Sequence, residues 1–577
     1  AAYRKLEWQF ATAIRVTASG AGGTYTPAEQ WVAFGSPASF TVSPDEGKCL
    51  YVVTNDFSTA TWLTTDVTIP CVRAPLNCFA TYRSAYYVKP DGDDANDGTS
   101  RATAKRTIAA AVALTSSTVD GEAVFVMDGV YTNTAQITIN KPCKVIGEHG
   151  PDKAMIFSKA STRVFYLDNA KALLEGIAIY SDATTSIGGN AAIYVNYGVV
   201  DGCVVSNFVS THSPIYVKNV GSAVKNTLVC RNATSGRTQS GIELDGSGTL
   251  AENCRIIGNT GNNDTYGCGL YLWGGSIARN CLVACNTNKS TNVAGAFVNS
   301  GTLENCTVVD NVILGGGVKA GVHLGDGAVR NCLVYGNRNT AGILEWSGTE
   351  SGYTYNCVTP APSGTGNILA NTPDFLDRAA MDYRLKSGNA IDAGVYRSWM
   401  DSATDLAGNP RIVGSAVDMG CFEYQPGALA ASVTPPFSSA FGPQDVTLTA
   451  FASGADLVGL VYSWTVKNEQ GETVYTASGP DATVTQLFGY GRYSIFLEVS
   501  NTAGETAPGA GRTPSRSLAK PSMSPAIRSR SSRILTRIAP RTTSTRPSRP
   551  AWTAPLSSSA TAPIRIPSRF QSPGRSP

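Results

Sequence analysis

Hydrophobic and polar residues alternate in short stretches bounded by glycine, as in GIELDG (241–246), GLYLWG (269–274) and GVHLGD (321–326). Such alternation predicts β-strands, because successive side chains of a strand point to opposite faces. A second pattern, Asn-Cys-x-aliphatic-x-x-Asn, recurs as ENCRIIGN (252–259), RNCLVACN (279–286), ENCTVVDN (304–311) and RNCLVYGN (330–337). A strand-forming repeat of this length predicts an all-β solenoid, a parallel β-helix with one turn per repeat.

Extending the motif both ways gives one register position per repeat: Cys143, Ile177, Cys203, Thr227, Cys254, Cys281, Cys306, Cys332 and Cys357. The first gap is 34 residues, and the later gaps are 24–27. We expect these side chains to stack inside the solenoid, because free cysteine behaves as a small buried hydrophobe. Two sets of asparagines predict amide ladders between turns, at corners whose left-handed geometry asparagine tolerates: Asn226, Asn253, Asn280, Asn305, Asn331 and Asn356 before the register position, and Asn232, Asn259, Asn286, Asn311 and Asn337 after it.

The flanks of the repeat region carry longer motifs. Residues 86–114 read as a strand, an acidic loop and a helix near 103–114, and VFVMDGVY (124–131) begins the turns. Together, residues 86–99, 107–111 and 124–131 resemble the entry motif of right-handed parallel β-helix surface proteins with a pectin-lyase-like fold. Residues 374–394 and 404–425 resemble the choice-of-anchor Q segment of those proteins. The resemblance covers roughly 84–426 and implies a β-helix at 84–373, completed by residues 374–426.

Two further modules flank the solenoid. Residues 1–83 are β-patterned and resemble small repeat modules of bacterial surface proteins, although the usual aromatic core motif after PDEG is absent. Residues 428–507 resemble a polycystic-kidney-disease-type (PKD-type) β-sandwich with Trp464 in its core and a last strand at 493–499. Both resemblances imply spacers or weak adhesion units.

Charge separates the tail, 508–577, from the body. After Glu505 there are 12 Arg and one Lys but no acid, so the rest carries 33 basic and 43 acidic residues. The tail is rich in Arg, Ser and Pro and cannot form a core, which predicts disorder. A nucleic-acid-binding arm is one interpretation. We favour a shifted reading frame, because the codons of Trp552–Ile564, read one base earlier, can encode VDGATVVVGDGTY, similar to VDGEAVFVMDGVY at 119–131.

The middle residues of the alternating strands predict an outward stripe of one residue per turn: Tyr194, Tyr216, Glu243, Tyr271, Phe297, His323 and Leu344. Aromatic rings at regular spacing suit stacking on sugar rings, and an exposed apolar stripe indicates contact with a ligand. The alternative is a structural aromatic ladder that a flanking loop or a neighbouring module covers.

Candidate chemistry is sparse. Glu243, Asp245, Asp264 and Asp326 are candidate acids and Lys218 and Lys319 candidate bases for a lyase or hydrolase, enzymes of this fold that cleave acidic polysaccharides. No motif of such an enzyme is present. The loop DGDDANDG (91–98) offers Asp91, Asp93, Asp94 and Asp97 to Ca²⁺, and a solvated turn that caps the following helix is the alternative. Cys71 and Cys78 are candidates for a disulfide, with Cys49 as a competitor.

These observations favour a non-enzymatic protein for adhesion or carbohydrate binding, with a polysaccharide lyase or glycoside hydrolase as the alternative. The partner would be a polysaccharide or cell-surface glycan rather than a nucleic acid, and no cofactor would be required beyond a candidate calcium ion. The resemblance implies an extracellular or bacterial cell-surface location, with any signal peptide outside this chain. No run of 18 apolar residues occurs, so we expect no membrane span. We also expect a monomer in solution.

Overall fold

The computed structural model describes residues 13–56, 64–69, 71–182, 186–187, 191–234, 241–261, 269–317, 319, 321–370, 373–413, 415–424, 430–434, 444–453, 459–468, 470–488, 493–501 and 506–508. The chain divides into two compact units, the first ending at Tyr424 and the second beginning at Gln425. Of the predicted tail, 508–577, all residues after Pro508 lie outside the described residues, so its reading frame stays a hypothesis.

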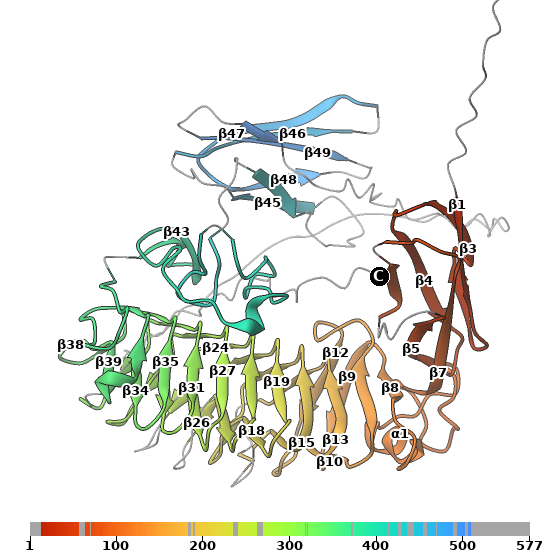
Figure 1. Ribbon diagram of the computed structural model, residues 1–577, viewed down its shortest axis with the longest axis horizontal. Coiled ribbons are helices and arrows are strands. Elements are labelled where there is room, and N and C mark those ends of the chain that lie inside the picture. The colour runs from red at the N-terminus through yellow and green to blue at the C-terminus, as the bar shows by residue number, and fades with distance from the viewer. Residues whose placement is uncertain are drawn as a thin grey trace, which may run out of the picture. The chain divides into compact units, whose positions relative to one another are not determined.

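Parallel strands stacked turn upon turn form a solenoid, which Figure 1 shows from the side. A ten-stranded sheet takes one strand from each turn: β9 (Gly129–Asn133), β12 (Ala154–Ser158), β14 (Ala178–Tyr180), β16 (Val204–Ser206), β20 (Leu228–Cys230), β24 (Arg255–Ile257), β28 (Leu282–Ala284), β32 (Thr307–Val309), β36 (Leu333–Tyr335) and β41 (Cys357–Val358). A seven-stranded sheet of two-residue strands comprises β17 (Val209–Ser210), β21 (Ala233–Thr234), β25 (Thr260–Gly261), β29 (Thr287–Asn288), β33 (Val312–Ile313), β37 (Arg338–Asn339) and β38 (Gly342–Ile343).

The largest sheet takes two strands from most turns. Its first turns contribute β8 (Glu122–Val126), β10 (Ile137–Ile139), β11 (Cys143–Gly147), β13 (Phe165–Glu175) and β15 (Ile193–Asp201). Later turns contribute the stripe strands, β18 (Ile215–Lys218), β22 (Ile242–Asp245), β26 (Leu270–Trp273), β30 (Ala296–Val298), β34 (Val322–Leu324) and β39 (Trp346–Gly348). They also contribute the charged-row strands, β19 (Ala223–Lys225), β23 (Leu250–Glu252), β27 (Ile277–Arg279), β31 (Thr302–Glu304), β35 (Ala328–Arg330) and β40 (Tyr353–Thr354). The predicted all-β class and parallel β-helix are confirmed.

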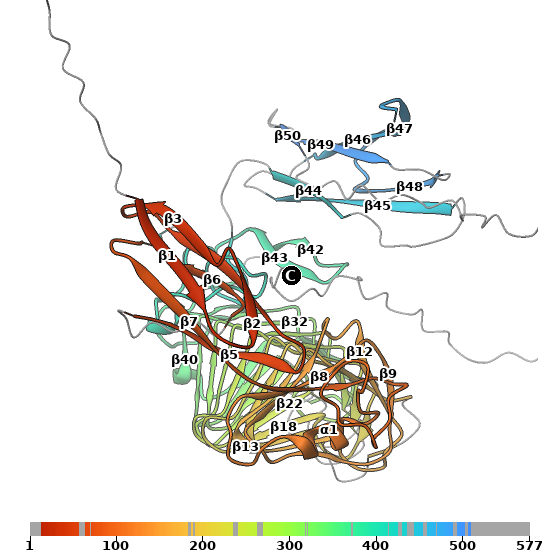
Figure 2. The ribbon, with the colours of Figure 1, turned by 90° about the vertical axis from the view of Figure 1, so that its right-hand side faces the viewer.

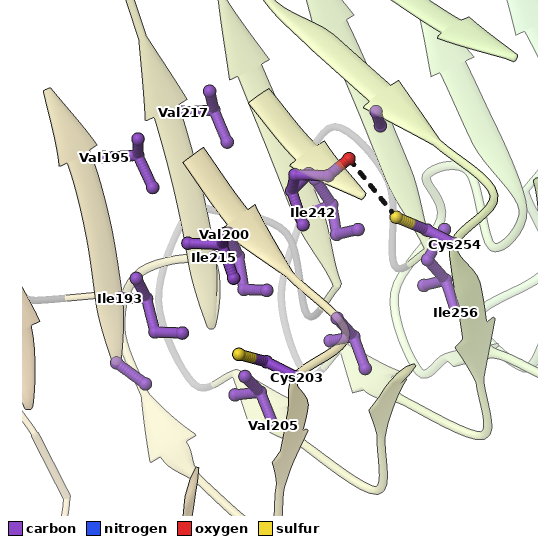
Figure 3. Close-up of a cluster of buried hydrophobic side chains, with 14 of the residues drawn as sticks. Ile193, Val195, Val200, Cys203, Val205, Ile215, Val217, Ile242, Cys254 and Ile256 are labelled. Atoms are coloured by element: carbon purple, nitrogen blue, oxygen red, sulfur yellow. Dashed lines mark hydrogen bonds between the residues drawn. The ribbon is translucent and has the colours of Figure 1, made fainter. Parts of the chain in front are cut away.

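Apolar side chains from successive turns point inward and form one continuous core. The register cysteines Cys203 and Cys254 are buried in it, and Figure 3 shows both pointing toward side chains of neighbouring strands. The Cys254 Sγ donates to the backbone oxygen of Val224 at 3.5 Å. Each turn therefore adds its own buried apolar residues, and stability accumulates along the stack as in other repeat proteins.

The predicted register holds from Ile177 to Cys332, because the residue after each register position pairs with its counterpart in the next turn. The prediction for Cys143 is wrong. This residue begins β11 in the largest sheet, whereas the residue in register with Ile177 is Ala154 of the ten-stranded sheet. The long first gap of 34 residues therefore came from matching two different sheets.

The prediction for Cys357 is also wrong, by one residue. Cys357 pairs with Leu333, so Asn356 occupies the inward position beside Cys332 and its Oδ1 accepts from the Cys332 N–H at 2.9 Å. Tyr355 takes the left-handed corner at φ +55° that asparagine holds in earlier turns. The dipeptide Asn-Cys recurs in this last turn, but it is shifted by one residue relative to the register of the earlier turns.

The asparagines before the register position form the corner, as predicted, with the exception of Asn356, whose corner Tyr355 takes. Asn226, Asn253, Asn280, Asn305 and Asn331 have φ between +47° and +56°, which asparagine adopts more readily than other residues with a Cβ. The amide of Asn280 donates to Asn253 Oδ1 at 2.6 Å, so neighbouring corners are also joined through side chains.

The asparagines after the register position form a buried amide ladder, also as predicted. Each donates its backbone N–H and its Nδ2 to the Oδ1 of the next member, with Nδ2 to Oδ1 distances of 2.8–3.0 Å from Asn232 to Asn337. The last member, Asn337, donates instead to Glu345 Oε2, at 2.7 Å from Nδ2 and 3.1 Å from N. Glu345 is buried, and burial raises the pKa of its carboxyl.

A charged column runs along the outer side of the charged-row strands and the strands before them. Its members stand in register and alternate in sign from the second onward: Glu175, Asp201, Lys225, Glu252, Arg279, Glu304 and Arg330. Glu252 lies 3.2 Å from Lys225 Nζ and 2.5 Å from Arg279 Nη2. Opposite charges directly across neighbouring strands favour this register over a slipped one.

Two structures precede the solenoid. A small module is formed by β1 (Ala13–Ser19), β3 (Glu29–Ala33), β5 (Lys48–Asn55) and β7 (Leu76–Val88), with a second sheet of β2 (Gly23–Thr26), β4 (Ala38–Pro44) and β6 (Asp66–Ile69). In the first sheet β1 pairs antiparallel with β3 and parallel with β7, and β5 pairs antiparallel with β7. β7 runs through the boundary expected at residue 84 and pairs with β8. Helix α1 (Ile108–Leu114) is shorter than predicted, since Thr107 caps it by accepting from the Ala110 N–H, and its buried face joins the solenoid core.

The C-terminal segment, 373–424, lies on the outer side of the ten-stranded sheet. It contains β42 (Asp374–Asp377) and β43 (Asp382–Ser387), and short 3₁₀ turns occur at Glu350–Gly352, before the segment, and Ser398–Met400, within it. Its apolar residues share a core with outward side chains of β28, β32, β36 and β41. A hydrogen bond also joins the C-terminal segment to the sheet, since Thr307 Oγ1 accepts from the Cys421 N–H at 3.0 Å.

The second unit is built of two antiparallel sheets, seen as two layers in Figure 2. One contains β44 (Ala430–Thr434), β45 (Gln444–Ser453) and β48 (Thr483–Phe488), and the other β46 (Val461–Lys467), β47 (Thr473–Gly479), β49 (Ser494–Ser500) and β50 (Thr506–Pro508). Trp464 lies in its core, as predicted.

The disulfide prediction is wrong. Cys49, Cys71 and Cys78 are free thiols. Cys78 is buried in the core of the N-terminal module, Cys71 is exposed, and Cys49 packs against Ala85 and Ala123 at the join with the solenoid. The three thiols thus lie in different environments, which sequence separation alone does not reveal.

Candidate functional site

The predicted stripe is a real column on the outer side of the largest sheet. Backbone pairing places its members side by side, one per turn, in the order Tyr166, Tyr194, Tyr216, Glu243, Tyr271, Phe297, His323 and Ser347. The prediction for Leu344 is wrong, since Ser347 holds that position and Leu344 packs near Ala294 and Ile313. Sequence reasoning missed Tyr166, which the alternation in VFYLD (164–168) indicates.

The expectation that the whole stripe is exposed is wrong. Glu243, Tyr271 and Phe297 are only 9%, 6% and 7% exposed. Residues that precede the stripe strands cover these three side chains. Val293 packs with the rings of Tyr271 and Phe297, and the Ser213 hydroxyl donates to Glu243 Oε2 at 2.8 Å. At these turns the alternative holds, in which a flanking segment covers an aromatic ladder.

The rings of the column contact one another at an angle. Centroids of Tyr166 and Tyr194 lie 5.5 Å apart, those of Tyr194 and Tyr216 4.9 Å, and those of Tyr271 and Phe297 5.3 Å. Such tilted and edge-to-face pairs stabilise the stack by about 0.5–1.5 kcal/mol each. The Arg163 guanidinium lies 4.8 Å from the Tyr194 centroid, which adds a cation–π contact at this end.

A second outward column lies two residues further along the same strands. Lys218, Asp245 and Trp273 are in register there. Lys218 and Asp245 are partly exposed, and Trp273 is 49% exposed, the most accessible side chain of the three. The Tyr216 hydroxyl donates to Asp245 Oδ2 at 2.5 Å and so ties the two columns together. Sequence reasoning missed Trp273, although the alternation in GLYLWG points it outward.

Burial dominates the electrostatics of the site. It raises the pKa of Glu243 to about 7, with a smaller raising effect from Asp245 and a lowering effect from the Ser213 hydrogen bond. Burial followed by the Asp245 hydrogen bond raises the pKa of Tyr216. Burial and the nearby Lys319 lower the pKa of His323 to about 4, so this imidazole is neutral at pH 7.

The structure brings some candidate catalytic groups together. Glu243 and Asp245 lie on one face of β22, and Lys218 stands beside Asp245 on β18. Lys319 lies 5.7 Å from the ring of Phe297, two strands further along the stack than Glu243, and Asp326 is exposed beyond β34. Asp264 lies outside the described residues. The cluster is therefore Lys218, Glu243 and Asp245.

The acidic loop, 91–98, uses its carboxylates within the fold. Asp94 accepts from the N–H groups of Arg106 and Thr107 and from the Thr107 hydroxyl at 2.8–2.9 Å. Asp97 accepts from Thr99 N–H and Thr103 Oγ1, and Asp93 from the Ala95 N–H. These bonds match the alternative of a turn that supports the helix start. Within the described ranges no group of three or more His, Cys, Asp or Glu is placed to hold a metal ion, and the calcium site at Asp91, Asp93, Asp94 and Asp97 stays a prediction.

No family model matches the chain, and no curated protein matches it. Pectin methylesterase from Aspergillus niger aligns with 48% of this chain and 91% of its own, at 14% identity and a TM-score of 0.28. Escherichia coli ybhc aligns with 51% of this chain and 79% of its own, at 16% identity and a TM-score of 0.22. A PL6 family alginate lyase, AlyGC, aligns with 45% and 52%, at 11% identity and a TM-score of 0.20. At TM-scores of 0.20–0.28 these similarities assign neither a fold nor an activity to this chain, and its β-solenoid is established by its own strand pairing.

Proposed function

We propose that this chain binds carbohydrate chains without cleaving them, through the outward side chains around Trp273. The observation that carries the proposal is the row of Trp273, Asp245 and Lys218, with a half-exposed indole beside a carboxylate and an ammonium group. An exposed indole offers an apolar face to a sugar ring. Carboxylate and ammonium groups supply the acceptors and donors that sugar hydroxyls need.

The binding surface differs from the sequence-based stripe. Tyr194, Tyr216 and His323 are half-buried and can border a ligand, whereas Tyr271 and Phe297 are covered and support the sheet beneath it. A regular row along parallel strands suits an extended polymer, because successive turns lie about 4.8 Å apart. We therefore favour a polysaccharide over a small sugar.

We also propose that the chain is secreted or located at the cell surface. Residues 374–426 resemble a choice-of-anchor Q segment and residues 428–507 a PKD-type domain, which supports a secreted or cell-surface location with the flanking modules as spacers. The proposal requires no cofactor. The described part of the chain contains no helix with the length and apolarity of a membrane span.

A glycan array with the full chain tests the proposal, followed by affinity measurements on any bound polysaccharide. Trp273→Ala should weaken binding about tenfold or more, as loss of a central aromatic contact commonly does. Trp31→Ala is the matched control, because Trp31 is 63% exposed on β3 of the N-terminal module. Binding that survives Trp273→Ala but not Trp31→Ala would place the ligand on the N-terminal module and refute the proposal.

One observation favours a polysaccharide lyase or glycoside hydrolase as a second candidate. Glu243, with its pKa near 7, stands two residues from Asp245 on one strand face. A protonated carboxylic acid beside a second carboxylate is the arrangement of acid–base cleavage of glycosidic bonds. Glu243 is only 9% exposed, however, which hinders direct contact with a polymer and places this candidate second.

One assay distinguishes carbohydrate binding without cleavage from polysaccharide cleavage. Incubation with acidic polysaccharides, followed by absorbance of unsaturated uronides and by reducing-end release, detects lyase and hydrolase activity respectively. Binding without product supports the first candidate. Product formation that Glu243→Gln abolishes would establish the second, with Asp326→Asn as a control at an exposed acid outside the cluster.

A further inference from the structure

The outer side of the ten-stranded sheet changes character along the solenoid. In β28, β32, β36 and β41 the outward residues Leu282, Thr307, Leu333 and Cys357 are buried beneath the C-terminal segment. At β24 the equivalent position holds Arg255, whose Nη2 donates to the backbone oxygen of Leu406 at 2.7 Å. This contact marks the border of the covered part.

Before that border the same positions stay apolar but are only half-buried. A second outward column lies two residues further along the same strands. In β12, β14, β16 and β20 the partly exposed apolar residues of the two columns are Met155, Phe157, Ala178, Tyr180, Val204 and Leu228. Val130 on β9 continues the column and is 48% exposed. We call these seven residues the open apolar face.

The open apolar face spans five adjacent strands, β9, β12, β14, β16 and β20. Five adjacent strands at about 4.8 Å spacing extend about 19 Å. It continues, residue for residue, a face that the chain itself buries two strands further on. Contiguous apolar patches with a polar surrounding mark interaction sites.

We propose that two copies of this chain associate through the open apolar face. The outward positions of β12, β14, β16 and β20 carry no charge, and Lys159, whose Nζ lies 5.7 Å from the Phe157 ring centroid, lies beyond the end of β12. In a two-fold dimer the same patch meets itself, so a central charge would face its own copy, and an uncharged patch avoids that cost. The Phe157 and Tyr180 rings, 5.4 Å apart, supply the aromatic contacts that such interfaces favour.

Sedimentation equilibrium of the full chain, from submicromolar to about 100 µM, tests the proposal against the monomer expected from sequence. A concentration-dependent dimer is expected. Leu228→Arg should weaken it at least about tenfold, because the charge enters a two-fold interface twice. Leu250→Arg is the matched control, since Leu250 is also half-buried and outward but lies on β23 of the largest sheet.

The outcomes are decisive in both directions. Dissociation by Leu228→Arg but not by Leu250→Arg supports the proposal. A wild-type chain that stays monomeric throughout overturns it, as does a dimer that both variants leave intact or both disrupt. Hydrogen exchange of the wild type provides a check that needs no variant, because β12 to β20 should gain protection as the concentration rises, and unchanged exchange in a dimer would place the contact elsewhere.

Discussion

Replacing Asn286 by alanine tests how much stability the buried amide ladder supplies. Its Oδ1 accepts from both the N–H and the Nδ2 of Asn259 at 3.0 Å, and its Nδ2 donates to Ile256 O at 2.9 Å and Asn311 Oδ1 at 3.0 Å. The substitution removes four hydrogen bonds and takes from the buried Asn259 N–H its acceptor. An orphaned donor costs about 1–3 kcal/mol and each lost bond about 0.5–1.5 kcal/mol, so we expect a loss of about 3–5 kcal/mol.

Urea unfolding followed by circular dichroism measures this loss as a lower transition midpoint. Asn299→Ala is the matched control, because Asn299 follows β30 at the half-exposed surface and stands outside the ladder. We expect the control to stay within about 0.5 kcal/mol of the wild type. Equal effects of the two substitutions would refute the view that the ladder stabilises the solenoid.

Three further predictions concern charge and thiols. Glu243 has a pKa of about 7 against an ordinary value of 4.5, so its stabilising effect is complete below pH 4.5 and disappears as pH rises through 7. In thermal melts the wild type should therefore lose on the order of 3 kcal/mol relative to Glu243→Gln between pH 4.5 and 8, and parallel profiles would contradict the buried acid. Glu252→Lys aligns three cations with Lys225 and Arg279 and should cost about 1–2 kcal/mol at low salt, less at high salt; a salt-independent loss in Tm would argue against a charge effect. Among the free cysteines that the structure describes, Cys71 is the exposed one and should react first with maleimide in the native state, as mass spectrometry of peptides would show.

The sequence predicted the solenoid because stacking imposes the same requirement at the same height in every turn. Cys254 and Cys281 repeat because one small inward side chain fits that layer, and Asn259 and Asn286 repeat because each amide needs its copy in the next turn. Because every turn must meet the same packing and hydrogen-bonding requirement, the residues that meet it recur periodically in the sequence. The ends lack a neighbour on one side, so Cys143 and Cys357 repeat the cysteine of the motif without its register.

The site was less predictable, because alternation tells which side chains leave the sheet but not what packs over them. Tyr271 and Phe297 point outward as expected, yet Val293 covers them from a connection without a period. Ser213 covers Glu243 in the same manner, and no sequence motif predicts that contact. Trp273 could have been predicted, because the alternation that points Tyr271 outward also points Trp273 outward, in the parallel column two residues further on.

The amide ladder has a direction and ends at Glu345, while β39, β40 and β41 continue the sheets beyond it. Every asparagine both accepts from the turn before and donates to the turn after, whereas Glu345 accepts from Asn337 and Gly336 and has no side-chain N–H to pass on. Whole turns can therefore be duplicated upstream of Glu345 without disturbing the relay, but a turn added downstream would begin without a donor. Solenoids of different lengths could thus arise from this chain by gain or loss of internal turns, with Glu345 retained as the residue that ends the amide ladder.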